Sequence, residues 1–309
     1  MPIKIFRKKQ ANVSSYTSIP KTDEEAAEWQ KANRDWWQEN PMSYEFDDLG
    51  EIKQEEYSKD WFEEIDRRFF LDSKHAIGWK TRPFDNIIPY DDLENLDVLE
   101  IGVGCGSHAS ILAKQSNHYT GIDLTENAIH ITKKRFKEFG IKGNLIQMDA
   151  EKMDFQNDSF DLIWSWGVIH HSSNTNNALS EITRILKPGG KLIAMVYHDS
   201  FWNRYIRGAL YYGILRGEFF EGNSLAKIIQ NNTDGALARY YSIREWNGLL
   251  SKKFDINKTI IIGSKSQLIP LGMGRMKRIL MSLIPDKIGR FITNRAFFGF
   301  MVVSEATKK

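Results

Sequence analysis

The pattern of hydrophobic and polar positions changes near residue 97. Beyond this point short apolar runs alternate with helical segments, which is typical of βαβ units and a parallel sheet. The expected strands are 98–101, 119–122, 144–148, 162–165, 191–197, 258–262 and 297–303. The helices expected between the first five strands are 107–115, 126–139 and 175–187. The pattern predicts an α/β fold with a seven-stranded, mostly parallel sheet and helices on both faces.

The chain before residue 90 is expected to be helical instead. Residues 22–39 open with Thr22, and Glu25 follows three positions later, which is the spacing of a capping box. Residues 58–77 place aromatic and aliphatic side chains at helical spacing, whereas residues 1–20 lack periodicity and predict an extended arm. The predicted division is a helical region at 1–90 and an α/β domain at 91–309, with helical insertions at about 201–253 and 271–296.

Composition places the chain among ordinary globular proteins, with 41% hydrophobic and 27% charged residues. The formal net charge of +2 argues against a general polyanion binder, although residues 45–66 are acidic and residues 275–295 are basic. The single cysteine, Cys105, excludes an intrachain disulfide. Because there is no secretory leader and no run of about 18 apolar residues, we expect a cytoplasmic protein.

The segment DVLEIGVGCGSHA, residues 97–109, joins the first strand to the first helix of the α/β region. Its acid and glycines are Glu100, Gly102, Gly104 and Gly106. Such a turn presents free backbone N–H groups, and small residues let a ligand approach the main chain. A dinucleotide-binding fingerprint would place its third glycine at position 107, where this chain has Ser107. The loop therefore predicts a ligand site of a different kind.

Further motifs accompany the loop along the chain. Asp123 ends the second strand, and Asp149 with Ala150 follows the third. The segment FDLIWSWGVIHHSSN spans 160–174, and ILKPGGKLIAMVYHD ends at Asp199. Together with the acid-x-G-x-G-x-G loop, this set resembles the class I S-adenosylmethionine-dependent methyltransferases, of the bacterial small-molecule type. The resemblance covers about 97–199, a third of the chain, and implies a Rossmann-like sheet.

The resemblance implies S-adenosylmethionine as the cofactor and assigns residues to it. The glycine loop would lie beneath its amino-acid end, and Asp123 would accept both ribose hydroxyls, with Leu124 beside it. Asp149 would take the exocyclic amine of adenine and the Ala150 N–H a ring nitrogen. Trp166 would pack near the cofactor. Structural alternatives are an N-cap for Asp123, although Thr125 is the better cap, and a surface turn for Asp149.

Polar side chains at the ends of the fourth and fifth strands are candidates for chemistry. His170 and His171 follow the fourth strand, and Tyr197, His198 and Asp199 end the fifth. A neutral imidazole is a usable general base near pH 7, so His170, His171 and His198 are candidate bases, with Tyr197 and Asp199 as candidate acceptor-binding residues. The alternatives are helix caps, pocket lining or a polar turn. The histidines and Cys105 show no metal-binding spacing, so no metal is expected.

Two regions outside the motifs are expected to contact ligands or partners. The helices before residue 90 look like a lid over the cofactor, with Tyr44 or Trp79 facing it. In the basic insertion at 273–295, one helical face carries Met273, Met276, Ile279, Leu280, Leu283 and Ile284. This face is expected to pack on the core and leave Arg275, Lys277 and Arg278 in solvent. The alternative is contact with an anionic membrane or a phosphorylated acceptor; nucleic acid is not expected.

The expected function is methyl transfer from S-adenosylmethionine to a small-molecule or glycan-like acceptor, at oxygen. Quinone, lipid or nitrogen acceptors are further possibilities. An alternative of another class is an S-adenosylmethionine-binding regulatory or membrane-docking protein without turnover. Slow turnover of the cofactor against a panel of acceptors would distinguish the enzyme from the binding protein. The sequence does not predict the oligomeric state.

Overall fold

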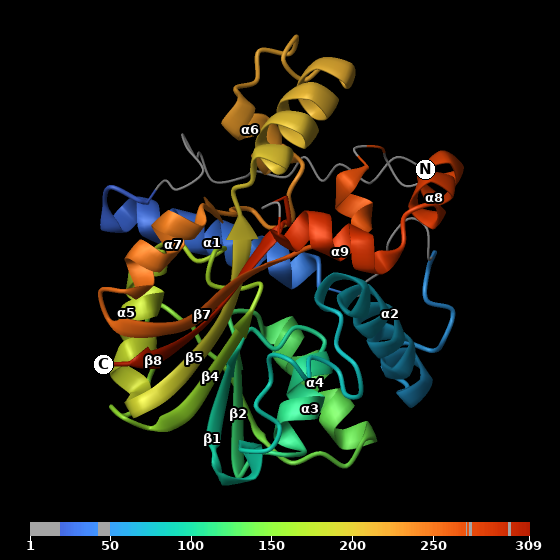
Figure 1. Cartoon of the computed structure of the whole chain (residues 1–309). Helices are drawn as coiled ribbons and strands as arrows, with labels where there is room; N and C mark the ends of the chain where they lie inside the picture. The colour runs from blue at the N-terminus through green and yellow to red at the C-terminus, as the bar shows by residue number, and fades with distance from the viewer. Residues whose placement is uncertain (1–18, 43–49, 270, 272–273, 296–297) are drawn as a thin grey trace.

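A computed structural model describes residues 19–42, 50–269, 271, 274–295 and 298–309 of the chain (Figure 1). The predicted arm therefore lies almost wholly outside the described residues. The same holds for Tyr44, Met273 and Phe297, to which the sequence assigned a place in the lid, the basic insertion and the last strand.

The centre of the structure is one mixed sheet with the strand order β3-β2-β1-β4-β5-β8-β7. Its strands are β1 Asp97–Ile101, β2 His118–Asp123, β3 Asn144–Gln147, β4 Phe160–Trp166, β5 Leu186–His198, β7 Phe254–Ile262 and β8 Met301–Lys308. The strands β1 to β5 are parallel, and β8 is antiparallel to both β5 and β7. A two-residue strand, β6 (Tyr240–Tyr241), also pairs with β5. The predicted α/β fold with a mostly parallel sheet is confirmed.

The last strand lies further along the chain than the apolar pattern predicts. The prediction was 297–303, whereas β8 begins at Met301 and continues to Lys308. Since β8 lies between β5 and β7, backbone hydrogen bonds on both sides extend it through polar positions, and Thr307 is paired with Lys191 and Asp255. Hydrogen bonding, which the hydropathy pattern does not report, decides where this strand ends.

Helices cover both faces of the sheet (Figure 1). They are α1 Asp23–Glu39, α2 Lys59–Ile77, α3 Ser107–Ala113, α4 Glu126–Glu138, α5 Thr175–Ile185, α6 Leu225–Asn231, α7 Ile243–Leu250, α8 Arg275–Ser282 and α9 Asp286–Arg295, with the 3₁₀ turns η1 Leu93–Asn95 and η3 Lys265–Leu268 and the π-helix η2 Trp202–Leu215. Val98 and Leu99 point to opposite faces of β1 and are both fully buried. The core therefore has two layers, one under α3 and α4 and one under α5 and α7.

Local side chains determine where the helices begin. Thr22 Oγ1 accepts the Glu25 N–H at 3.2 Å, so α1 starts at Asp23. The Glu25 carboxylate accepts from the Lys21 N–H, so the predicted capping box is only half formed. Thr125 caps α4 as predicted, because its hydroxyl accepts the Ala128 N–H at 3.3 Å. This cap fixes the turn that follows Asp123.

The predicted packing of the basic insertion is wrong. Met276, Ile279, Leu280 and Leu283 are exposed, whereas Lys277 is buried and its Nζ donates to the Leu271 carbonyl at 3.2 Å. The inward face of α9 consists of small residues, Gly289 and Thr293, which lie close against η3 and the end of β7. On α8 the buried position is that of Lys277, so the apolar face of this helix lies on the outside. Within the described ranges, no helix is long and apolar enough to cross a membrane.

Candidate active site

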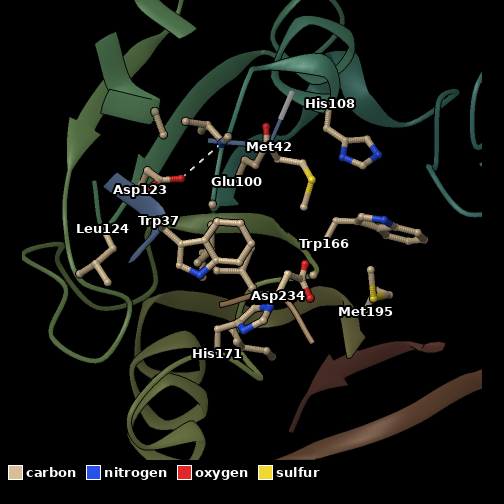
Figure 2. Close-up of a pocket in the computed structure, with 18 of the residues that line it drawn as sticks. Trp37, Met42, Glu100, His108, Asp123, Leu124, Trp166, His171, Met195 and Asp234 are labelled. Carbon is tan, nitrogen blue, oxygen red and sulfur yellow. Dashed lines mark hydrogen bonds between the residues drawn. The ribbon is translucent and has the colours of Figure 1, made fainter. Parts of the chain in front are cut away.

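A cavity of about 440 Å³ lies at the carboxyl ends of the parallel strands, where ligands of open α/β sheets bind (Figure 2). The predicted site residues that line it are Glu100, Gly102, Gly104, Asp123, Leu124, Asp149, Ala150, Trp166, His171 and Tyr197. The predicted residues Gly106, His170, His198 and Asp199 are not part of the lining. The motifs therefore converge on one space, although adjacent residues within a motif do not all reach it.

Glycine is not needed for the same reason at all three positions of the loop. All three have positive φ, of +84° at Gly102, +52° at Gly104 and +81° at Gly106. A Cβ on Gly102 would lie 2.2 Å from the Val168 side chain, and one on Gly106 would lie 2.9 Å from the Arg135 side chain. A Cβ on Gly104 would meet no atom within 4 Å. Only Gly104 therefore leaves open space over the loop, and the other two are required by packing.

The Asp123 carboxylate is held in place by the turn that surrounds it. Its Oδ1 accepts the Thr125 N–H at 2.9 Å and the Thr125 hydroxyl at 2.8 Å, and its Oδ2 accepts the Gly104 N–H at 3.3 Å (Figure 2). Burial raises the pKa of Asp123, while these hydrogen bonds act in the opposite direction. The side chain is thus preorganised at the cavity wall and joins the β2 turn to the glycine loop.

Glu100 supplies a second buried carboxyl group to the same end of the cavity. It is 2% exposed, and its Oε2 accepts the Tyr119 hydroxyl at 2.6 Å. Burial raises the pKa of Glu100 to about 8, with the neighbouring Asp123 charge adding to the rise and the Tyr119 hydrogen bond opposing it. A cation entering this end of the cavity would favour the ionised form of Glu100.

Gln30 of helix α1 lines the cavity and links the turn after β3 to the segment after β4. No role was predicted for this residue from the sequence. Gln30 Nε2 donates to Asp149 Oδ1 at 2.8 Å, and Gln30 Oε1 accepts the Ser173 N–H at 3.1 Å. Asp149 Oδ1 also accepts the Glu151 N–H at 2.8 Å. A glutamine on a polar helix face carries no sequence signal for this position, since both partners lie more than a hundred positions away in the chain.

The position of the His171 ring hydrogen is determined by a backbone contact. Its Nδ1 lies 2.6 Å from the Leu237 carbonyl oxygen, which can only accept, so Nδ1 carries the hydrogen. Burial lowers the pKa of His171, so the neutral imidazole presents an unprotonated Nε2 at neutral pH. Nε2 is buried and has no hydrogen-bond partner among the residues that the structure describes. The Trp37 ring meets the imidazole edge-on at 5.2 Å (Figure 2).

Tyr197 and Asp234 form a hydrogen-bonded pair beside His171. The Tyr197 hydroxyl donates to Asp234 Oδ1 at 2.7 Å, and burial raises the pKa of Tyr197 well above its usual range. Asp234 belongs to the loop between α6 and β6. Its neighbour Gly235 has φ +79°, and a Cβ there would lie 2.7 Å from His171 Nδ1, so both the backbone conformation and the packing favour glycine. Asp234 was not predicted from the sequence, where its only signal is an Asp-Gly turn.

The remaining candidate bases are held away from the cavity. His170 is fully buried with its ring centroid 4.0 Å from that of Tyr197, and His198 Nδ1 is bonded to the Gly299 carbonyl at 2.8 Å. Burial lowers the pKa of both imidazoles. Their positions do not suit the predicted role of a base, because neither side chain reaches the lining.

Two further predicted contacts with ligands do not agree with the structure. Asp199 forms an ion pair with Arg204, so its carboxylate is directed to η2 and not to the cavity. Trp79 lies beneath the Lys74 ammonium group, 4.5 Å from the ring centroid, and does not line the cavity. The residues before position 90 that do reach it are Gln30, Asn33, Trp37, Pro41 and Met42, and Phe69, Asp72, Ser73, Ala76 and Ile77 of α2.

Comparisons with known proteins find matches to part of this chain. Residues 99–194 match the family model described as a methyltransferase domain. This segment is a class I methyltransferase domain. The chain is 35% identical over 101 residues to the phthiotriol/phenolphthiotriol dimycocerosates methyltransferase of Mycobacterium tuberculosis. The match covers 32% of this chain and 37% of that protein. It is 34% identical over 101 residues to the fatty-acid O-methyltransferase of Mycolicibacterium smegmatis, covering 32% and 36%.

The similarity is thus confined to part of each protein, because the chain spans little more than a third of the length of these relatives. Among solved structures, a chain in the complex between the Haloferax volcanii Trm112 methyltransferase activator and a methyltransferase is 16% identical. The match covers 81% of this chain and 94% of that chain with a TM-score of 0.50, which supports the fold alone.

The residues of the methyltransferase domain fit S-adenosylmethionine in the polar groups that they present and in the space that they leave open. Gly104 leaves space above the loop for the amino-acid end, and the buried Glu100 carboxyl suits a nearby cation. Asp123 and Asp149 present carboxylate oxygens at the next two strand ends, as hydroxyl and amine groups require. Within the described residues, no cluster of three or more histidine, cysteine or acidic side chains is arranged to hold a metal.

Proposed function

We propose that this protein transfers the methyl group of S-adenosylmethionine to a hydroxyl oxygen of a small-molecule acceptor with an apolar body. The observation that carries the proposal is the His171 imidazole, which lines the cofactor cavity with its hydrogen on Nδ1 and a free Nε2. When bound, S-adenosylmethionine supplies a methyl group activated by a positively charged sulfur. A hydroxyl acceptor is a weak nucleophile and gains most from a base at this position.

We assign proton removal, positioning of the acceptor and exclusion of water to residues of the protein. His171 Nε2 takes the acceptor proton and returns it to solvent after the reaction, while the Leu237 carbonyl keeps the imidazole in the required tautomer. The Tyr197 ring, fixed by the hydrogen bond from its hydroxyl to Asp234, lines the same end of the cavity and packs beside the acceptor. The α1 lid and its Trp37 exclude water from this space.

The lining of this end favours an apolar acceptor body over a sugar. The cavity lining includes the apolar side chains of Trp37, Phe69, Trp166, Met195, Phe300 and Met301, beside polar residues such as Asn33, Ser73 and Gln267. The hydroxyl groups of a glycan would have no partners against the apolar part of this lining. The names of the relatives, which refer to dimycocerosates and a fatty acid, support the same choice without selecting one molecule.

The test is formation of the demethylated cofactor by the purified full chain. Methyl-labelled S-adenosylmethionine would be incubated with a panel of hydroxy fatty acids, phenols and simple sugars, and the labelled product identified by mass spectrometry. We expect transfer to a hydroxyl of an apolar acceptor, and its loss in His171→Gln. Tight binding of the cofactor without transfer to any acceptor would support a binding protein without turnover instead.

A further inference from the structure

The consecutive helices α8 and α9 form an exposed surface that combines apolar and basic side chains. Its apolar members are Met276, Ile279, Leu280, Leu283, Ile288 and Phe291, and its basic members are Arg275, Arg278, Lys287 and Arg295. Leu283 is 73% exposed and Phe291 68% exposed, so these large side chains lie in water and not in the core. We call these ten residues the α8–α9 surface.

Helical spacing places the apolar residues of this surface together. Met276, Ile279, Leu280 and Leu283 follow the i, i+3, i+4, i+7 pattern of one helical face, and Arg275 and Arg278 flank that face. On α9, Ile288 and Phe291 share the exposed side with Lys287 and Arg295, opposite the buried Gly289 and Thr293. Both helices therefore turn an apolar stripe bordered by cations toward solvent.

The cations of this surface are available to an external partner. The acid of the segment, Asp286, is already engaged with Lys265 at 2.9 Å and with His75 at 2.8 Å. No ion pair occurs between Arg275, Arg278, Lys287 or Arg295 and any acid in the part of the chain that the structure describes. An apolar stripe bordered by unpaired cations is the arrangement that binds anionic lipid headgroups above an acyl layer.

The surface is attached to the wall of the candidate active site. The Lys265–Asp286 ion pair joins α9 to η3, whose Gln267 lines the cavity, and the Thr293 hydroxyl donates to the Gly263 carbonyl at 2.8 Å. Figure 1 shows α9 across the carboxyl edge of the sheet with α8 beyond it. A bilayer in contact with the α8–α9 surface would lie beside the apolar end of the cavity.

We propose that the α8–α9 surface docks this protein on an anionic lipid bilayer. The apolar side chains enter the boundary between headgroups and acyl chains, and the four cations contact lipid phosphates. Docking also brings a lipid-dissolved acceptor to the cavity; this second part rests on the proposed function, whereas docking itself does not.

The test is sedimentation of the purified full chain with vesicles of phosphatidylcholine alone or of phosphatidylcholine with 30% phosphatidylglycerol, roughly a physiological anionic fraction. We expect binding to the anionic vesicles, little binding to the neutral ones, and release by 0.5 M salt, roughly where screening becomes strong. Equal binding to both kinds of vesicle, or none to either, would overturn the proposal. Calorimetry with the demethylated cofactor on the same preparation tests the proposed function separately.

Two double variants with reversed charges test whether vesicles bind to the α8–α9 surface. Arg275→Glu with Arg278→Glu should weaken anionic vesicle binding by about tenfold or more, since each cation near such a surface contributes measurably. The matched control, Lys133→Glu with Lys137→Glu on α4, makes the same change of charge elsewhere and should bind nearly as wild type. Equal losses in both pairs would overturn the assignment to this surface.

Leu283→Ser with Phe291→Ser should also lose vesicle binding, whereas Leu71→Ser, an exposed residue of α2, should not. Both positions are exposed, so folding is not expected to suffer, and unfolding curves would verify this. Light scattering across a concentration series provides the competing outcome. A dimer that Leu283→Ser with Phe291→Ser dissociates would show that a second copy of this chain covers the surface, and would overturn docking on lipid.

Discussion

The two ends of the cavity are built in different ways. The cofactor end is made by short motifs at the tips of β1, β2 and β3, and Asp123 and Asp149 each accept hydrogen bonds from the turn that follows their own strand. The acceptor end is assembled from distant parts of the chain: His171 follows β4, Tyr197 ends β5, and Asp234 comes from a loop between α6 and β6. Local motifs thus form the end that we assign to the cofactor, whereas long-range contacts form the end that we assign to the acceptor.

The largest effect is expected at the acceptor end, from His171→Gln. The variant should lower kcat roughly 10²–10⁴-fold, because it removes the base and keeps a side chain of similar size. The affinity for the demethylated cofactor should change little. The control is His198→Gln, whose side chain does not line the cavity and which should keep near wild-type kcat. Equal kinetics in the two variants would remove histidine from the mechanism.

The pH dependence of activity sharpens the same test. Burial lowers the pKa of His171, so the imidazole loses its base function only below its ordinary pKa of about 6.5. Activity should therefore be level across neutral pH and fall as the pH drops through the lowered pKa. His171→Gln should lack this acid limb. A wild-type profile that falls above pH 7 with decreasing pH would contradict the assignment.

At the cofactor end, Gly102→Ala should have the next largest effect. The substitution combines an unfavourable φ with a Cβ 2.2 Å from Val168, so it should lower the free energy of unfolding by about 2–4 kcal/mol. Gly104→Ala is the matched control, because its Cβ meets nothing within 4 Å and only the backbone strain of about 1–2 kcal/mol remains. Urea unfolding without ligand measures both. Similar losses would mean that Val168 moves aside.

Asp123→Ala should weaken binding of the cofactor by roughly 1.5–3 kcal/mol, as expected for loss of hydrogen bonds to a charged group. Isothermal calorimetry with S-adenosylmethionine measures the change. Asp199→Ala serves as the control, since Asp199 is paired with Arg204 outside the lining, and should leave affinity unchanged. An unchanged affinity in folded Asp123→Ala would separate this carboxylate from the cofactor.

The smallest effect is expected where the two ends are joined, at Gln30→Leu. Loss of its hydrogen bonds with Asp149 and Ser173 should cost about 0.5–1.5 kcal/mol each. Both the cofactor affinity and the acceptor KM should therefore change several-fold. Gln38→Leu is the control on the same helix, because Gln38 bonds to Asn127 and not to the cavity. A change confined to one ligand would show that the two ends act independently.

The positions of the parallel strands along the chain, and the residues that line the end of the cavity assigned to the cofactor, could be predicted because their signals are local. Apolar runs separated by helical segments determine the parallel strands, and the loop from Glu100 to Gly106 carries its acid and glycines within seven positions. At the acceptor end the signals are not local, since the Leu237 carbonyl that orients His171 lies 66 positions away. Only the folded chain brings them together.

Two wrong expectations have identifiable physical causes. Successive side chains of a strand alternate between faces, so Tyr197 and His198 at the end of β5 cannot both point into one cavity. The structure places Tyr197 there and bonds His198 to Gly299 on the other side. On α8 the helical pattern identified the apolar face, but periodicity does not reveal whether a face meets protein, lipid or water.

The bond between His171 and the Leu237 carbonyl ties two side chains of the cavity to one loop. Leu237 determines which nitrogen of His171 carries the hydrogen, and Asp234 of the same loop holds the Tyr197 hydroxyl. A substitution that displaces this loop would therefore alter His171 and Tyr197 together.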